Sequence, residues 1–203
     1  QSIECRCMSQ LRPRFSLYTL LRLIVTGSGS GIGRATAELF ADHGARVVVS
    51  DIDEVSGQAV AETLGGHAMF LPLDTTREEQ WEHLLDAVNG KLGGIDVLVN
   101  NVGSTLGLMK PFEKMSDDDF DALYSVLLKH VFVFSREAIP LIRRSGSGSI
   151  IHVSSIEGYR GLPNLAPYAA FKLALEGFTK SLALELGKDR IRVNTIAPET
   201  TES

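Results

Sequence analysis

Tyr168 and Lys172, spaced by one helical turn, offer acid–base chemistry in the second half of the chain. The segment Tyr-Ala-Ala-Phe-Lys puts a phenol and an ammonium on the same face of a helix. A phenol has an ordinary pKa of ~10, but a neighbouring positive charge favours the phenolate, so the pair could exchange a proton with a hydroxyl group. Ser155, 13 residues before Tyr168, could hold the same hydroxyl by a hydrogen bond. These three are the candidate catalytic residues.

A glycine-rich turn near the start of the chain offers a place for phosphate groups. Residues 26–33 read Thr-Gly-Ser-Gly-Ser-Gly-Ile-Gly, with the spacing Gly-x-x-x-Gly-x-Gly at Gly27, Gly31 and Gly33. Glycines allow a tight turn and a close backbone approach, and the free amides of the following helix favour negative charge. Taken alone, the turn is as compatible with an ordinary loop as with a dinucleotide site.

Asp51 favours the dinucleotide interpretation. It ends the run Val-Val-Val-Ser-Asp, 18 residues after Gly33. An acid at about this distance accepts hydrogen bonds from a ribose hydroxyl and repels a 2′-phosphate. Neither Ser30 nor Ile52 is basic, so the pattern favours NAD over NADP. Arg34 is the one nearby basic residue that would favour NADP.

Short apolar runs alternate with amphipathic stretches along the chain. This alternation predicts βαβ units and an α/β fold, with helices on both faces of a doubly wound parallel sheet. The expected strands are 20–26, 46–50, 68–73, 97–100, 149–154 and 190–195.

Helix starts are marked by a polar residue followed three positions later by an acid. Thr76 with Glu79 and Ser116 with Asp119 fit this pattern, and Gly44 provides a helix end. The expected helices include 34–43, 117–144 and 168–186.

Five motifs follow one another in a set order: the glycine turn, Asn-Asn-Val-Gly at 100–103, Ser155, the Tyr-x-x-x-Lys pair, and Arg-Val-Asn-Thr at 192–195. As an ordered set, from about Leu20 to Ser203, they resemble the short-chain dehydrogenase/reductase family. The resemblance implies a Rossmann-like fold, a homodimer or homotetramer, and hydride transfer between NAD and a secondary alcohol or ketone. Tyr168 would act as base in oxidation and acid in reduction, Lys172 would favour the phenolate and bond the nicotinamide ribose, and Ser155 would hold the substrate oxygen.

The same resemblance implies a set of cofactor contacts spread over the strand ends. Asp74 is expected at the adenine, although it fits a helix-start residue as well. The expected cofactor-binding residues are Gly27, Ser30, Gly31, Ile32, Gly33, Asp51, Asp74, Thr75, Asn101, Gly103, Tyr168, Lys172, Pro198 and Thr201.

Two features depart from the family pattern. Leu127 stands where relatives commonly carry an asparagine that holds a water for a proton relay, and leucine cannot hydrogen-bond water. The chain also stops just after its sixth expected strand, so we expect that strand to be an edge of the sheet. Substrate selection is then expected to depend on residues 104–106 and 156–165. An alternative function is therefore a truncated, catalytically weak NAD-binding protein that acts as a binding or assembly partner.

The composition argues against several other classes of protein. The 203 residues carry a formal charge of −5, which argues against nucleic-acid binding, and no apolar run approaches membrane-spanning length. Cys5 and Cys7 cannot complete a zinc site, and the five histidines lack ligand spacing, so no metal is expected. We expect an irregular arm at 1–18 and one cytoplasmic catalytic domain at 19–203, with a small-molecule alcohol or ketone as substrate.

Overall fold

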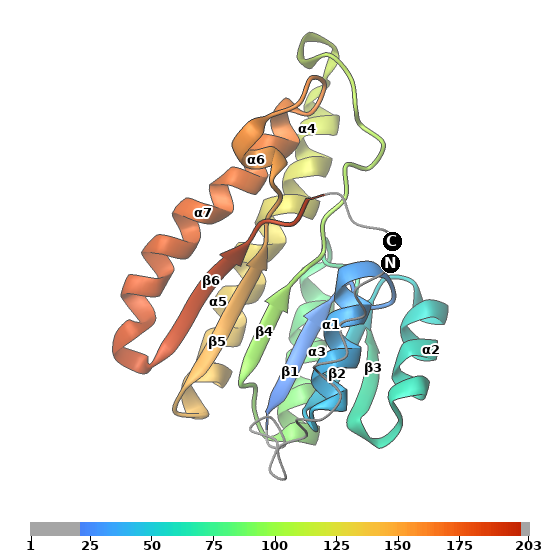
Figure 1. The fold of residues 1–203 in the computed structure, drawn as a ribbon, viewed down its shortest axis with the longest axis vertical. Coiled ribbons are helices and arrows are strands. Elements are labelled where there is room, and N and C mark those ends of the chain that lie inside the picture. Colours follow the sequence, from blue (N-terminus) through green and yellow to red (C-terminus); the bar gives the residue numbers. More distant parts are fainter. Residues whose placement is uncertain (1–20, 200–203) are drawn as a thin grey trace, which may run out of the picture.

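The computed structural model describes residues 21–199. Its centre is a six-stranded sheet in the order β3-β2-β1-β4-β5-β6, with every neighbouring pair parallel (Figure 1). The strands are β1 (Arg22–Thr26), β2 (Arg46–Asp51), β3 (Ala68–Pro72), β4 (Val97–Asn100), β5 (Gly148–Val153) and β6 (Ile191–Ile196). The predicted Rossmann-like α/β fold is confirmed. The arm at 1–18, Leu20 of the first expected strand and Thr201 lie outside the described residues.

Helices cover both faces of the sheet. They are α1 (Gly31–Asp42), α2 (Glu54–Leu64), α3 (Glu78–Leu92), α4 (Asp117–Tyr124), α5 (His130–Arg144), α6 (Glu157–Arg160) and α7 (Ala166–Leu186). Short 3-10 turns are η1 (Gly65–His67), η2 (Phe112–Lys114) and η4 (Gly187–Asp189), and η3 (Ser125–Lys129) is a π-helical turn.

Alternate residues of each strand divide the core into two layers, because successive side chains point to opposite faces of a sheet. In β1, Leu23 and Val25 pack with the helices α1 and α2, whereas Ile24 packs with α3, α5 and α7. A third apolar cluster joins α4, η3 and α5 to α7, and it includes Leu127 and Phe171.

Two helix predictions need correction. Thr76 does not cap α3: its amide and hydroxyl both donate to the carboxylate of Asp74, and the helix starts at Glu78. The helix expected at 117–144 contains the π turn η3, which places Leu127 and Leu128 in the core. The capping box of Ser116 with Asp119 is confirmed.

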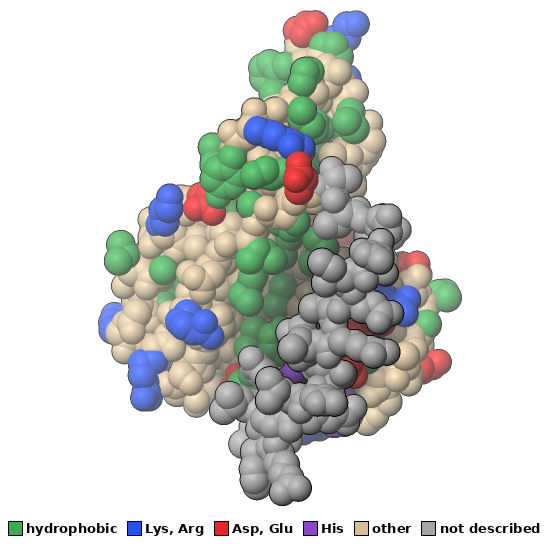
Figure 2. Space-filling view, in the orientation of Figure 1, with side chains coloured by type: hydrophobic (Ala, Val, Ile, Leu, Met, Phe, Trp, Pro, Cys, Tyr) green, Lys and Arg blue, Asp and Glu red, His purple; other side chains and the backbone are tan. Residues whose placement is uncertain are grey.

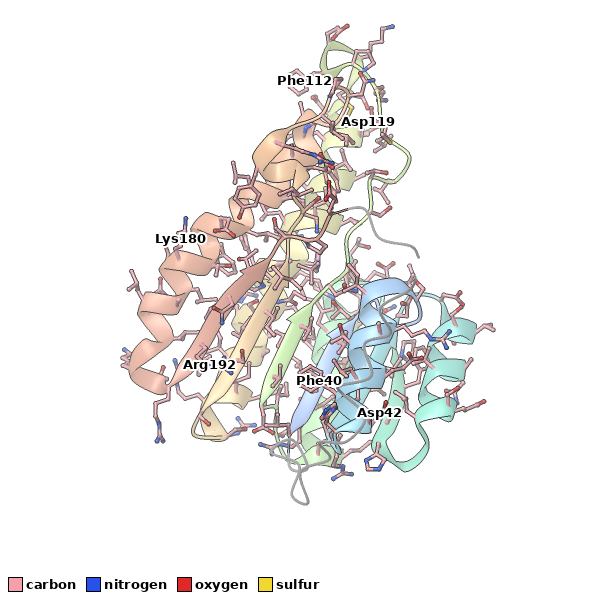
Figure 3. All side chains as sticks on the ribbon, viewed as in Figure 1. Phe40, Asp42, Phe112, Asp119, Lys180 and Arg192 are labelled. Atoms are coloured by element: carbon pink, nitrogen blue, oxygen red, sulfur yellow. The ribbon has the colours of Figure 1, made fainter. Side chains whose placement is uncertain are left out.

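The described part of the fold has two sheet edges and one projecting end. β3 and β6 are the edges of the described sheet, and α4 with η2 forms a projecting end, where Figure 3 labels Phe112 and Asp119. Between residues 21 and 199, no helix has the length and apolar character needed to cross a membrane.

Candidate active site

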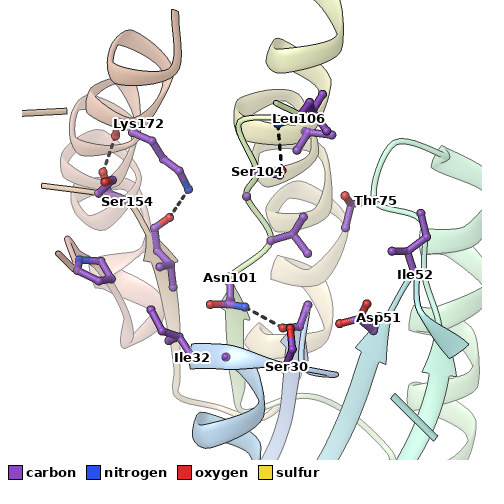
Figure 4. Close-up of a pocket in the computed structure, with 18 of the residues that line it drawn as sticks. Ser30, Ile32, Asp51, Ile52, Thr75, Asn101, Ser104, Leu106, Ser154 and Lys172 are labelled. Carbon is purple, nitrogen blue, oxygen red and sulfur yellow. Dashed lines mark hydrogen bonds between the residues drawn. The ribbon is translucent and has the colours of Figure 1, made fainter. Parts of the chain in front are cut away.

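A pocket of about 660 Å³ opens at the carboxyl ends of the strands (Figure 4). It lies where the chain reverses direction across the sheet between β1 and β4, the place where open α/β sheets bind ligands. The structure brings most of the residues expected from the sequence into this one wall: Gly27, Ser30, Gly31, Ile32, Asp51, Asp74, Thr75, Asn101, Gly103, Ser155, Tyr168, Lys172 and Pro198.

The glycine turn joins β1 to α1 and exposes backbone to the pocket. Gly27 and Gly31 have φ angles of +65° and +51°, a conformation that disfavours side chains. Gly33 does not line the pocket; a Cβ there would lie 2.0 Å from the carbonyl oxygen of Gly27. Gly33 thus allows α1 to start against the turn, which aims the first turn of α1 at the pocket.

Asn101 and Thr26 brace this turn from β4. The Asn101 amide nitrogen donates to the carbonyl oxygens of Thr26 and Gly27, both at 3.0 Å. The Thr26 hydroxyl accepts from the backbone amide of Asn101 at 3.0 Å. Asn101 lines the pocket, and its side-chain nitrogen holds the shape of the turn.

Asp51 faces the glycine turn from the end of β2. One carboxylate oxygen accepts from the amide of Gly29 at 2.8 Å, and the other accepts from the amide of Asp53 at 3.0 Å. The carboxylate is thereby held at the pocket wall beside Ser30 (Figure 4), and its remaining lone pairs can accept from a ligand hydroxyl.

Asp74 and Thr75 form the wall after β3. The Asp74 carboxylate accepts from Thr76, and the Asp74 amide donates to Gln80 at 2.7 Å. Thr75 is buried. Both residues line the pocket, and Thr75 lies at the same end of it as Asp51 (Figure 4).

Lys172 enters the pocket wall from α7 and is buried. Its ammonium donates to the carbonyl oxygen of Val153 at 2.8 Å, and its own carbonyl accepts from the hydroxyl of Ser154 at 2.7 Å (Figure 4). Burial disfavours the charged form and lowers the pKa of Lys172 to about 8. A substantial part of the lysine therefore loses its charge in mildly alkaline solution.

Tyr168 and Ser155 share this part of the wall. The ammonium of Lys172 lies 6.0 Å from the centre of the Tyr168 ring, as expected for residues one turn apart on one helix face. Ser155 follows β5 and accepts a hydrogen bond from the amide of Glu157 at 3.2 Å, which fixes its hydroxyl oxygen near the start of α6. A phenol, an ammonium and a hydroxyl thus converge on one space.

Charged side chains close the rim after β6. Arg160 of α6 bonds Glu157 at 2.6 Å and Glu199 at 2.7 Å, and Glu199 lines the pocket. The carbonyl oxygen of Pro198 accepts from Ile156 at 3.0 Å, which ties the segment after β6 to the segment after β5.

The profile of the short chain dehydrogenase family matches residues 22–203. The chain belongs to the short-chain dehydrogenase/reductase family. A 3-oxoacyl-acyl-carrier-protein reductase of Thermotoga maritima is 39% identical to this short-chain dehydrogenase/reductase over 183 residues, which are 89% of this chain and 74% of the relative. A cyclopentanol dehydrogenase of Comamonas sp. is 38% identical over 179 residues, or 87% of this chain and 71% of the relative.

Family membership makes the protein an oxidoreductase that uses a nicotinamide cofactor, NAD(H) or NADP(H). The residues present fit such a group. One end of the pocket offers glycine backbone, helix amides and a carboxylate, and the other end offers the phenol and ammonium. Gly103 leaves room between them, since a Cβ at that position would lie 2.6 Å from the ammonium of Lys172.

Three residues at or behind the pocket were not predicted from the sequence. Ser28 is buried and bonds Val25 and Ser50, and the hydroxyl of Ser154 holds the backbone of Lys172. His130 lies in the core, where burial lowers the pKa of its imidazole to about 3. Ser154 adjoins a predicted residue and could have been found by its place at a strand end. Nothing in the local sequence around Ser28 or His130 indicates these contacts or this burial.

Proposed function

We propose that the protein transfers hydride between NAD and a secondary alcohol or ketone, with Tyr168 as the acid–base residue. The observation that carries this proposal is the convergence of Ser155, Tyr168 and Lys172 on the pocket that the glycine turn borders. Hydride leaves a carbinol carbon readily only when the hydroxyl proton leaves as well, so the phenol belongs beside that oxygen.

In oxidation, Tyr168 as phenolate accepts the proton of the substrate hydroxyl. The ammonium of Lys172 stabilises the phenolate by its charge, and Ser155 donates a hydrogen bond to the substrate oxygen. The bound nicotinamide supplies the hydride acceptor. In reduction, Tyr168 returns the proton to the oxygen. Since burial lowers the pKa of Lys172 to about 8, the supporting charge is present at neutral pH and declines above it.

The charge of Asp51 supports NAD as the cofactor. A 2′-phosphate beside this carboxylate would place like charges close together. Arg34, the residue that could compensate, donates instead to Glu38 at 2.7 Å along the exposed side of α1 and does not line the pocket.

A substrate of mixed polar and apolar character suits the open side of the pocket. Ser104 and Leu106 line it, whereas residues 156–165 contribute no side chain to the described wall and act on it through the Arg160–Glu199 ion pair. Relatives named for cyclopentanol and for 3β-hydroxysteroids support a cyclic or extended secondary alcohol.

Replacement of Tyr168 tests the mechanism. We expect Tyr168→Phe to lower the alcohol-dependent reduction of NAD by a factor on the order of 100 to 10,000, because the proton acceptor is lost while the ring remains. Cofactor binding, followed by fluorescence titration, should stay within about threefold.

Tyr124→Phe is the matched control, because Tyr124 packs against Phe171 away from the pocket wall. Wild-type turnover by Tyr168→Phe on a substrate from a broad alcohol and ketone panel would contradict the proposed mechanism.

Leu127 favours a second candidate, a cofactor-binding protein without efficient turnover. Its fully buried side chain brings hydrocarbon to the neighbourhood of Gly103 and Lys172. That function predicts NAD binding, no turnover by the wild-type protein on the same panel, and no effect of Tyr168→Phe on its cellular role.

We further propose that the protein forms a homodimer or homotetramer. Exposed apolar side chains gather on the projecting end around α4 and α6 (Figure 2), and α7 exposes Leu173 and Leu184. A monomer in sedimentation at micromolar concentration would refute this assembly.

A further inference from the structure

An arginine joins two segments of the chain at the rim of the pocket. Arg160 ends α6, which follows β5, and Glu199 lies in the segment that follows β6. The guanidinium of Arg160 donates to a carboxylate oxygen of Glu199 at 2.7 Å, across 39 positions of the chain. Neither the proton transfer nor the hydride transfer uses this ion pair, so its role is open.

Backbone contacts hold this part of the rim beside the catalytic serine. The carbonyl oxygen of Pro198 accepts from the amide of Ile156 at 3.0 Å, and Ile156 directly follows Ser155. The hydroxyl of Ser155 in turn accepts from the amide of Glu157 at 3.2 Å. Glu199, the residue after Pro198, is therefore held at the end of the pocket where Ser155 lies, and it lines the wall.

The charges of this rim do not cancel. Arg160 makes two hydrogen bonds to the carboxylate of Glu157, at 2.6 and 3.1 Å, and one to Glu199. Two carboxylates thus share one guanidinium, and the excess charge is negative. Because a two-bond contact between guanidinium and carboxylate is the stronger one, the charge of Glu199 is the less compensated.

A ligand in the pocket can reach the carboxylate of Glu199 but not that of Glu157. The Glu157 side chain is 13% exposed and does not line the wall, whereas the Glu199 side chain is 68% exposed and does. A carboxylate has about four acceptor positions, and the bond from Arg160 takes one of those on Glu199. Arg160 itself does not line the wall, so a ligand meets the acid of this ion pair and not the base.

Other charges on the wall do not offset Glu199. Among residues 21–199, the charged residues that line the pocket are Asp51, Asp74, Lys172 and Glu199. Lys172 is 3% exposed, and its ammonium donates inward to the carbonyl oxygen of Val153. Asp51 lies away from Lys172 at the other end of the pocket (Figure 4). The exposed charge at the end with Lys172 is therefore that of Glu199.

We propose that Glu199 is a specificity-determining residue that selects secondary alcohols with a cationic or neutral end group over those with an anionic one. Arg160 moderates this selection by compensating part of the charge. The proposal rests on the proposed function, since it names the substrate class of the same site. A cationic end group is attracted to the Glu199 carboxylate, whereas an anionic one meets a like charge. Because Glu199 is exposed, water screens the effect, and we expect a factor of about three to five.

Three matched alcohols test the selection: 4-hydroxypentanoate, its neutral amide, and 4-hydroxypentyl-trimethylammonium. The measured quantity is the ratio of kcat/KM for the cation to kcat/KM for the anion. Glu199→Gln keeps the size of the side chain and removes its charge, and it should lower this ratio about threefold to fivefold. The value for the amide should stay within about twofold. Raising the ionic strength from about 0.01 M to about 1 M shortens the screening length from about 30 Å to about 3 Å and should lower the wild-type ratio in the same way.

Arg160→Gln separates a charge effect from a structural one. Both this substitution and Glu199→Gln remove the ion pair between the two segments. If the pair only holds the rim in shape, both variants change the three alcohols alike and leave the ratio unaltered. If Glu199 acts by its charge, Arg160→Gln raises the ratio about twofold to threefold, because the guanidinium no longer compensates the carboxylate. Glu38→Gln is the matched control, since it removes a carboxylate from the exposed Arg34–Glu38 pair outside the pocket wall and should leave the ratio unchanged.

Binding measurements distinguish failure of this proposal from failure of the proposed function. Calorimetry gives the affinity of the NADH-loaded protein, in which no alcohol can be oxidised, for each of the three compounds. Binding in the order cation, amide, anion without turnover by the NAD-loaded protein would support the selection and contradict the proposed function. Turnover with the same ratio in the wild type and in Glu199→Gln would overturn the selection and leave the proposed function standing. No binding of any of the three alcohols would overturn the selection as well.

Discussion

Some side chains that line the pocket also hold its backbone in place. The carboxylate of Asp51 anchors the glycine turn through Gly29, and the same carboxylate lines the pocket. Asn101 likewise lines the pocket while holding the turn through Gly27. Substitutions that retain shape and hydrogen bonds are therefore needed to isolate the binding role of each residue.

Asp51→Asn removes the charge and retains an oxygen for the amide of Gly29. We expect the ratio of NADP to NAD affinity to rise about tenfold, equivalent to about 1.4 kcal/mol, because the repulsion of a 2′-phosphate is relieved. Titration calorimetry with both cofactors measures this ratio. Glu54→Gln removes a nearby charge outside this pocket wall and should leave the ratio within about twofold. An unchanged ratio in Asp51→Asn would show that the carboxylate does not discriminate between the cofactors.

At the scale of elements, the junction of β1 with α1 depends on close backbone packing. A Cβ on Gly33 would meet the carbonyl oxygen of Gly27 at 2.0 Å and the amide nitrogen of Asn101 at 2.6 Å. Neither atom can move freely, because one is backbone and the other is bonded to the turn. The position of α1 relative to the pocket therefore depends on the absence of a side chain at Gly33.

Gly33→Ala should displace the turn and weaken NAD binding by at least tenfold. It should also lower the free energy of unfolding by about 1–3 kcal/mol, the usual effect of overpacking. Gly90→Ala is the control, since a Cβ at Gly90 meets nothing within 4 Å in α3, and we expect it to raise stability by about 0.5–1 kcal/mol. Urea unfolding and cofactor titration measure the two effects. Normal binding by a stable Gly33→Ala protein would show that the turn tolerates the added methyl group.

At the scale of the whole molecule, two buried histidines make the free energy of unfolding depend on pH. Burial lowers the pKa of His130 to about 3 and that of His152 to about 4. An unfolded histidine titrates near ~6.5, so the unfolded chain binds more protons below that pH and becomes favoured. Each histidine contributes stability that is complete above about pH 7 and declines as the pH falls toward the folded value.

The free energy of unfolding should therefore fall by several kcal/mol between pH 7 and pH 5, at about 1.4 kcal/mol per pH unit for each histidine once below pH 6. Urea unfolding at half-unit intervals measures this slope. Carboxylates such as Asp96, whose pKa is lowered mainly by Arg22 against the opposing effect of burial, remain ionised over this range. His152→Phe should reduce the slope by about one proton, whereas a flat profile in the wild type would mean that the imidazoles are hydrated in the folded state.

The sequence by itself determined the fold class, the strand ends that carry the site, and the residues that meet in the pocket. The fold class, the glycine turn and the pair of Tyr168 with Lys172 follow from local patterns: apolar runs, glycine spacing and a separation of one helical turn. The positions of Asp74, Thr75, Asn101 and Pro198 were instead implied by the resemblance to the family. Side-chain periodicity and backbone freedom act over a few residues, so they can be read along the chain.

Only the tertiary structure decided which partner each polar group takes. Thr76 bonds Asp74 instead of capping α3, Asn101 bonds the glycine turn, and the hydroxyl of Ser154 holds the backbone of Lys172. These contacts join residues that are distant in the chain or depend on competition between alternative hydrogen bonds. Their geometry is set by helix packing and by burial, which no local spacing specifies.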